Sequence, residues 1–547
     1  MRTAAIILSA VVHAFAFPPW EQSWLAWISL LPFLLALHGL SPLRGFAAGW
    51  LWGTLAIWVV AYWVPPALMF YYQQPWWFAL LFCVVGSQIL WGTYYAAFGA
   101  VACVIANRTA GVLRVGLLSC AWIAAEYARS RLLTGEPWML LGYGLVPELS
   151  MIQIADLGSV YLISFVVFFV NAALAESLSS RPPLPRGDYR GVDTVGADGA
   201  GGSGSRTTLL RYLPLAPSLV RRGDPLRLGV PLLASGLLVL GTWLYGQWRL
   251  GQVIPHAREA NVAVIQGNVA AGAQWRSDLY AKGLREYLEA SRAALADGDV
   301  DLLVWPESAV TFFLAQEPGF LAAVRDLLAP FDAELVLGGP HVDDRDPARP
   351  LYFNYAFAVP PDGITGRYDK AHLLPFGEYF PLRMIELLRR RFERVRTFTP
   401  GSGETLLDTP AGRAAVVICF EAIFPEKVRR QMNQGADLLL NLTNDVWLGD
   451  HAGPRQHASM VVLRAIENRT WVVRSTTTGV SAVIDPHGRV VASTDTGVAA
   501  TLRARVAGVN TVTGYERFGD LFAHLCVAGL GAFGILSWRR RGDRSTV

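Results

Sequence analysis

The segment AAVVICFEAIFP, residues 414–425, joins an apolar run directly to the start of a helix. Its first five residues are small or β-branched and all apolar, which is typical of a strand buried on both faces. Pro425 suits the first turn of a helix, where no backbone N–H donor is needed. Cys419 is therefore expected between strand and helix, near backbone N–H groups that lower a thiol pKa and hold an oxyanion.

Similar apolar runs flank this segment and alternate with helical patterns. Strands are expected at 261–267, 301–305, 334–339, 354–359, 414–420, 437–443, 471–476 and 480–485, and helices at 275–295, 318–329, 425–434 and 455–468. Strands this apolar indicate a sheet covered on both faces, either by helices or by a second sheet. The pattern alone leaves both arrangements open.

The whole chain is too apolar for an ordinary soluble enzyme, with 53% hydrophobic and 16% charged residues, where soluble proteins carry about a quarter charged. The apolar residues gather in runs of about 20, long enough to cross ~30 Å of hydrocarbon. We predict eight membrane spans, at 3–19, 23–39, 46–64, 77–105, 112–128, 158–178, 226–248 and 519–538. The first is alternatively a cleaved signal peptide, because Ala14-Phe15-Ala16 resembles a cleavage site.

Basic residues in the short loops predict the orientation of these spans. With the N-terminus inside, the outer short loops contain only Arg129 and Arg131. The inner segments contain Arg2, Arg44, Arg108, Arg114, the eight arginines from Arg181 to Arg227, and Arg539, Arg540, Arg541 and Arg544, and inner loops are where basic residues gather. The predicted organisation is six spans in 1–180, a flexible cytoplasmic linker at 181–225, a span at 226–248, an extracytoplasmic domain at 255–515, a span at 519–538 and a basic cytoplasmic tail at 539–547. The net charge of +4 is too small to imply a nucleic-acid partner.

Two further residues are candidates for chemistry beside the thiol. Glu307 follows the expected strand 301–305, at the edge where α/β sheets bind ligands and a carboxylate can act as a general base. Lys370 is one of only three lysines and precedes a Pro-Phe-Gly turn that ends in Glu378. Taken alone, Glu307 is equally well a helix cap or a solvated loop charge. Lys370 alone is typical of a surface residue, and Cys419 alone is either an inert buried thiol or a free reactive one. Together with Cys419 they supply a nucleophile, a base and a cation for an oxyanion.

The order Glu307, Lys370 and Cys419 resembles the Glu-Lys-Cys triad of the nitrilase superfamily. The run from Tyr368 to Tyr379, YDKAHLLPFGEY, is similar to the lysine motif of one membrane-embedded branch, the apolipoprotein N-acyltransferases. The resemblance covers essentially the whole chain. It implies a helical multi-span membrane domain joined to an α/β nitrilase-like αββα sandwich, with no metal and no organic cofactor.

Other positions match the same family. Trp275 follows a strand end that is similar to the family's opening motif, and Trp138 falls in an outer loop that lies close to the active site in the family. An interfacial anchor is the alternative role for Trp138. Glu378 and Glu421 match carboxylates beside the triad, whereas Phe420 departs from the pattern, because an aromatic residue with a hydroxyl often stands there.

The resemblance implies lipoprotein maturation in the bacterial inner membrane, with the catalytic domain facing the periplasm or cell exterior. An acyl chain passes from a phospholipid to Cys419 as a thioester, and then to the N-terminal amine of an S-diacylglyceryl-cysteine apolipoprotein. One alternative is a membrane-tethered nitrilase-type amidase, and another is a receptor or transporter. Eight spans exceed what a tether needs, and ionisable residues within the spans are sparse for a transporter.

Overall fold

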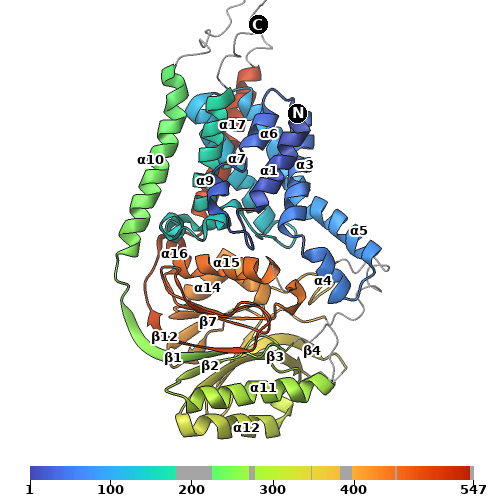
Figure 1. The fold of residues 1–547 in the computed structure, drawn as a ribbon, viewed down its shortest axis with the longest axis vertical. Helices are drawn as coiled ribbons and strands as arrows, with labels where there is room; N and C mark the ends of the chain where they lie inside the picture. The colour runs from blue at the N-terminus through green and yellow to red at the C-terminus, as the bar shows by residue number, and fades with distance from the viewer. Residues whose placement is uncertain are drawn as a thin grey trace, which may run out of the picture.

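The structure is a computed structural model, and it describes residues 1–179, 225–269, 277–346, 348–381, 397–403, 405–449 and 452–542. Apolar helices form one end of the molecule and two stacked sheets with their covering helices form the other (Figure 1). The predicted linker at 181–225, apart from its last residue, and the predicted site residue Trp275 lie outside the described residues.

The helical end is a bundle built from apolar segments. Its elements are α1 (Arg2–Ala14), η1 (Ser23–Trp27), α2 (Leu31–Leu37), α3 (Pro42–Val60), α4 (Val64–Phe70), α5 (Trp76–Ser87), η2 (Gln88–Gly92), α6 (Thr93–Ala106), α7 (Gly111–Arg131), η3 (Leu141–Leu145), α8 (Leu149–Ile152), α9 (Ala155–Ser179), α10 (Pro225–Leu250) and α17 (Leu521–Gly542). The short α16 (Gly514–Phe518) leads into α17.

Six helices among the described residues are long and apolar enough to cross a membrane: Pro42–Val60, Trp76–Ala106, Gly111–Arg131, Ala155–Ser179, Gly229–Leu250 and Leu521–Arg539. They coincide with the last six predicted spans. The first two predicted spans form shorter apolar helices, Arg2–Ala14 and Ser23–Leu37. A count of eight crossings therefore stays a prediction.

The sandwich contains two six-stranded sheets. The first has the order β12-β1-β2-β3-β4-β5 and the second the order β11-β10-β9-β8-β7-β6. The strands are β1 (His256–Gln266), β2 (Leu302–Val304), β3 (Glu334–Asp343), β4 (Leu351–Val359), β5 (Gly366–Asp369), β6 (Leu407–Thr409), β7 (Gly412–Ile418), β8 (Leu438–Thr443), β9 (Val472–Thr476), β10 (Ala482–Ile484), β11 (Val490–Ser493) and β12 (Ala500–Val509). All eight predicted strands are present, and β5, β6, β11 and β12 are additional.

The strand pattern left open whether helices or a second sheet cover each sheet, and in the structure each sheet has helices on one face and the other sheet on the opposite face. Alternate residues of β7 face opposite sides, so that Val416 and Ile418 enter the core between the sheets, whereas Ala415 and Val417 enter a core shared with the bundle. Helices α11 (Ser277–Ala296) and α12 (Pro318–Leu328) cover the first sheet, and α14 (Pro425–Met432) and α15 (Ala452–Asn468) cover the second (Figure 1). The predicted αββα sandwich is confirmed.

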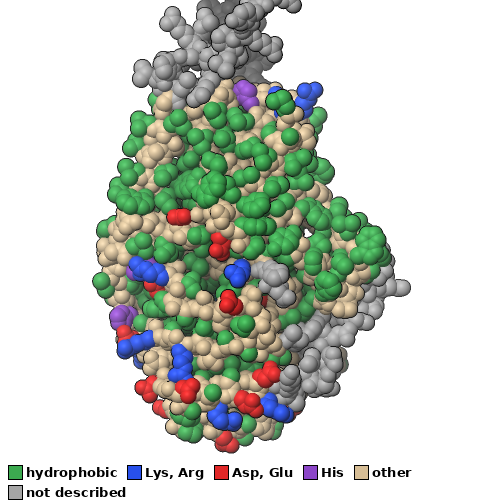
Figure 2. Space-filling view, in the orientation of Figure 1, with side chains coloured by type: hydrophobic (Ala, Val, Ile, Leu, Met, Phe, Trp, Pro, Cys, Tyr) green, Lys and Arg blue, Asp and Glu red, His purple; other side chains and the backbone are tan. Residues whose placement is uncertain are grey.

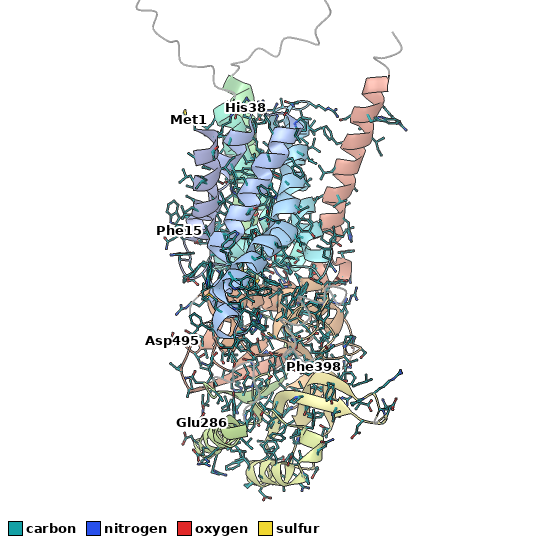
Figure 3. The ribbon with its side chains drawn as sticks, turned by 90° about the vertical axis from the view of Figure 1, so that its right-hand side faces the viewer. Met1, Phe15, His38, Glu286, Phe398 and Asp495 are labelled. Atoms are coloured by element: carbon teal, nitrogen blue, oxygen red, sulfur yellow. The ribbon has the colours of Figure 1, made fainter. Side chains whose placement is uncertain are left out.

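The two ends of the molecule present different surfaces. Hydrophobic side chains dominate the surface of the bundle, whereas charged side chains gather over the sandwich (Figure 2). Met1 and His38 lie at the far end of the bundle, and Glu286 on α11 lies at the opposite end of the molecule (Figure 3). Helices α14 and α15 form the layer between these regions (Figure 1).

Glycines allow α3 and α6 to pack backbone against backbone. A Cβ added at Gly49 would lie 2.0 Å from the backbone oxygen of Tyr95, and one at Gly99 would lie 2.1 Å from that of Gly45. Small residues at helix contacts are a common basis of association in membranes, because they let helices approach closely.

Replacing Gly49 with Ala should force α3 and α6 apart at a cost of about 1–3 kcal/mol, the usual range for overpacking. The measurement is the midpoint of thermal unfolding in detergent, which should fall. Gly116→Ala on α7 is the matched control, because nothing lies within 4 Å of the added Cβ and alanine favours helix. Equal midpoints for the two variants would contradict the close contact.

Candidate active site

Glu307 follows β2 in the first sheet, and its carboxylate is held by groups from both sheets. The side chain is buried. Its Oε2 accepts a hydrogen bond from the backbone N–H of Asn444 at 2.7 Å, at the end of β8 in the second sheet. Its Oε1 accepts one from the side-chain amide of Asn354 on β4, also at 2.7 Å. The carboxylate is therefore fixed in the space where the ends of the two sheets meet.

Lys370 directly follows β5 and places its ammonium between two carboxylates. Its Nζ lies 2.9 Å from the Glu378 carboxylate and 3.5 Å from Glu307 Oε1. The Pro-Phe-Gly turn returns Glu378 to this position, with Phe376 at a φ of 62° and the Glu378 N–H donating to the Leu374 carbonyl. Lys370 and Glu378, which lie on either side of the turn in the sequence, thus form a direct ion pair.

Asn354 is a site residue that the sequence analysis missed. Its side-chain amide donates to Glu307 and to Glu378, each at 2.7 Å. Its backbone carbonyl accepts from the Lys370 N–H at 2.8 Å. The available signal was an amide side chain at the start of an otherwise apolar predicted strand, 354–359.

Cys419 begins the 3₁₀ turn η6 (Cys419–Ile423) immediately after β7, as the strand-to-helix pattern predicts. Its φ of 51° lies in the left-handed region, which residues other than glycine seldom adopt. The thiol is buried, with 3% of the residue exposed. A strained backbone of this kind persists only where the surrounding structure holds it.

Glu421 joins the cysteine turn to the lysine loop. Its carboxylate accepts from the backbone N–H groups of Ile418, Ala371 and His372 at 2.8–2.9 Å, and from the Tyr368 hydroxyl. Glu421, which the sequence analysis matched to a family carboxylate, is thus a buried side chain that hydrogen-bonds both loops.

The pKa of the Cys419 thiol differs from what its position between strand and helix predicted. Burial and the charge of Glu307 raise the pKa of Cys419, although Lys370 acts to lower it. The expectation that nearby N–H groups lower the pKa of Cys419 is therefore wrong. Burial removes the thiolate from water, and this desolvation outweighs the effect of the N–H groups. A thiol whose pKa is raised in this way would need a base before it could act as a nucleophile.

Burial also raises the pKa of Glu307, with Lys370 lowering it and Glu378 raising it further. For Lys370, burial acts to lower the pKa, but Glu307 and Glu378 outweigh this effect and raise it. The site therefore holds a permanent ammonium beside a carboxylate that accepts protons more readily than a surface glutamate.

The remaining predicted residues lie around this centre. The Phe420 ring stacks on His372, with centroids 5.8 Å apart and planes at 11°. Trp138 lies in the loop between α7 and η3, and its indole N–H donates to Gln456 on α15. Within the described part of the chain, no group of three or more His, Cys, Asp and Glu side chains is arranged to hold a metal ion.

The chain matches two family models, the N-terminal domain of apolipoprotein N-acyltransferase over residues 9–173 and carbon-nitrogen hydrolase over 261–509. A protein named apolipoprotein N-acyltransferase from Geobacter metallireducens is 33% identical, across 98% of this chain and 95% of that protein. The chain belongs to the apolipoprotein N-acyltransferase family. Another member, from Agrobacterium fabrum, is 29% identical across 99% of this chain and 97% of its own.

Solved structures of the nitrilase superfamily also align with this member of the apolipoprotein N-acyltransferase family. Saccharomyces cerevisiae Nit3 aligns with a TM-score of 0.36 and 20% identity, over 46% of this chain and 91% of its own. An amidase from Nesterenkonia aligns with a TM-score of 0.36 and 18% identity, over 50% and 100%. With six long apolar helices among its described residues, this family member is a bacterial membrane protein and an enzyme.

Proposed function

We propose that the protein transfers an acyl chain from a membrane phospholipid to the N-terminal amine of an S-diacylglyceryl-cysteine apolipoprotein, through a thioester on Cys419. Family membership supports the reaction as a whole. The observation that carries the mechanism is the convergence of a buried thiol, a buried carboxylate and a buried ammonium, in which Lys370 contacts Glu307 and both act electrostatically on Cys419.

In the first step, Glu307 takes the proton of Cys419 and the sulfur attacks the ester carbonyl carbon of the phospholipid. Lys370 and the backbone N–H of Phe420 stabilise the negative oxygen of the tetrahedral intermediate. The ester C–O bond then breaks, and Glu307 returns the proton to the departing lysophospholipid. A thioester on Cys419 remains.

In the second step, the α-amine of the lipoprotein attacks the thioester carbonyl. Glu307 takes a proton from the amine, the C–S bond breaks, and the proton passes to the sulfur of Cys419. One carboxylate therefore serves as base and acid in both steps. Its raised pKa, caused mainly by burial, suits this double duty.

The membrane helices adjoin the site, which favours lipids as both substrates. The loop after Lys370 packs on α5, where the Phe376 ring lies 5.0 Å from that of Phe82. Helix α5 exposes large apolar side chains, including Trp76, Trp77 and Leu81. An exposed apolar helix thus packs against the loop that carries Lys370, which suits a lipid substrate and which a water-soluble amide does not need.

The distribution of arginines supports the inner membrane, with the site facing the periplasm. Met1 and His38 lie at the end of the bundle remote from the sandwich (Figure 3), and Arg2 donates to the His38 carbonyl. Arg44 lies in the first turn of α3, which begins four residues after His38. Inner loops of membrane proteins carry such an excess of basic residues. The bundle end that joins the sandwich is then the outer one.

The first test is intact mass spectrometry of the purified protein with and without phospholipid. Wild type should gain the mass of one acyl chain, and a diacylglyceryl-cysteine peptide should discharge the adduct and become acylated on its amine. Cys419→Ala is the control and should gain nothing. Discharge by water with no acylated peptide would favour the amidase alternative, and absence of any adduct would refute the thioester.

The second test concerns pH. Glu307 acts as a base only when ionised, so acylation is lost as the pH falls through its raised pKa. Glu378→Gln removes a charge that raises this pKa, and the acid limb of the acylation rate should move to lower pH. The exposed Glu317→Gln is the control and should leave the limb unmoved. An acid limb that stays in place in Glu378→Gln would argue against Glu307 as the base.

A further inference from the structure

Gln456, near the start of α15, uses its whole side-chain amide to bind the membrane bundle. Its Oε1 accepts from the indole N–H groups of Trp63 at 3.1 Å and Trp138 at 2.8 Å. Its Nε2 donates to the carbonyls of Pro18 and Val60, each at 2.9 Å. An amide has two donor protons and two acceptor lone pairs, and all four are used. The residue is fully buried.

His457, the next residue, faces the nucleophile. Its Nε2 lies 3.3 Å from the carbonyl oxygen of Cys419, and its Nδ1 lies 2.9 Å from Asp445. Because a carbonyl has no proton to give, the contact with Cys419 is a hydrogen bond only with the proton on Nε2. With that proton on Nε2, Nδ1 accepts from an Arg474 N–H 3.3 Å away, and the same guanidinium binds Asp445 at 2.6 Å.

The partners of Gln456 in the bundle are themselves rigidly placed. Arg129 on α7 donates to the Trp138 carbonyl at 3.1 Å and pairs with Glu136 at 2.7 Å. The Trp138 ring also lies against His457, with centroids 5.8 Å apart. Two adjacent residues thus connect the membrane helices to the backbone of the nucleophile by hydrogen bonds and ring contact.

We propose that Gln456 and His457 are positioning residues for acyl transfer. Gln456 fixes the start of α15 to the membrane helices, and His457 holds the carbonyl of Cys419, so that the thiol keeps a set position relative to the bilayer. The inference rests on the proposed function of Cys419 as nucleophile. Both residues act through other groups and need no contact with substrate.

The physical reason is the strained backbone of Cys419. A residue at φ 51° relaxes towards a commoner conformation unless its peptide groups are held. The hydrogen bond from His457 holds one of them, and a thiol that drifts by about 1 Å can lose two orders of magnitude in rate. Loss of the bond should therefore slow the reaction of bound lipid without weakening lipid binding.

The test compares His457→Asn with His457→Gln in single-turnover acylation, followed by intact mass over a range of phospholipid concentrations in mixed micelles. The glutamine amide reaches the position of Nε2, whereas the asparagine amide reaches only that of Nδ1. His457→Asn should lower the first-order rate constant at saturating lipid about tenfold, with the half-saturating concentration unchanged within about twofold. His457→Gln should retain most of the rate.

Partial unfolding does not imitate this result, because it lowers the amount of adduct and leaves the first-order rate constant unchanged. Asn468→Ala is the matched control, since Asn468 is buried on the same helix and donates only within it, to the Arg464 carbonyl. Wild-type rate constants in both His457 variants would overturn the inference, and so would equal losses in both. Absence of an adduct in wild type itself would refute the proposed function instead, and the inference with it.

The role of Gln456 is tested by Gln456→Leu, alone and combined with His457→Asn. If both residues belong to one connection, the double variant should be about as slow as His457→Asn alone, because coupled residues are not additive. Rate losses that multiply would show independent roles and would overturn the connection.

Discussion

The rest of the site depends on the pairing of the buried Lys370 ammonium with two carboxylates. A charge removed from water is tolerated only when it is paired and hydrogen-bonded, and Lys370 meets two carboxylates, Glu307 and Glu378. The second carboxylate leaves an excess of negative charge, which the Asn354 amide and backbone N–H groups compensate. Those donors come from β4, from the loop after β8 and from the lysine loop, so the charge cluster requires the assembled sandwich.

The same cluster explains why the thiol is protonated at rest. With Glu307 nearby and water excluded, an ionised sulfur is unfavourable, and Lys370 offsets only part of that cost. In the proposed mechanism, this arrangement of charges favours the oxyanion intermediates over a resting thiolate. A negative oxygen that forms beside Lys370 gains a fixed cation without reorganisation of solvent, whereas a free thiolate in the same pocket would be exposed to side reactions.

Local sequence patterns predicted Glu307 and Cys419 as strand-end residues and Lys370 as a residue before a Pro-Phe-Gly turn. The structure places Lys370 in contact with Glu307 and all three in one electrostatic cluster. Six apolar runs also became long helices. Asn354 and Gln456 were missed because their partners are up to 438 residues away in the chain, and no periodicity encodes such pairings. The raised pKa of the thiol was missed because it results from burial, which depends on the whole fold. The local sequence shows only that a helix begins after Cys419, a feature that by itself lowers a thiol pKa.

The proposed function requires two membrane-anchored substrates to reach one thiol, and the junction between the two parts of the molecule suits that requirement. The hydrophobic core runs without a break from the second sheet through α14 and α15 into the bundle. Buried polar contacts cross it at several points, including Arg469 with Asp156 and Ser159 with Glu467. A flexible tether would let the thiol move relative to the leaflet, and each encounter would cost orientational entropy. A junction that is both packed and hydrogen-bonded spends that entropy once, when the protein folds.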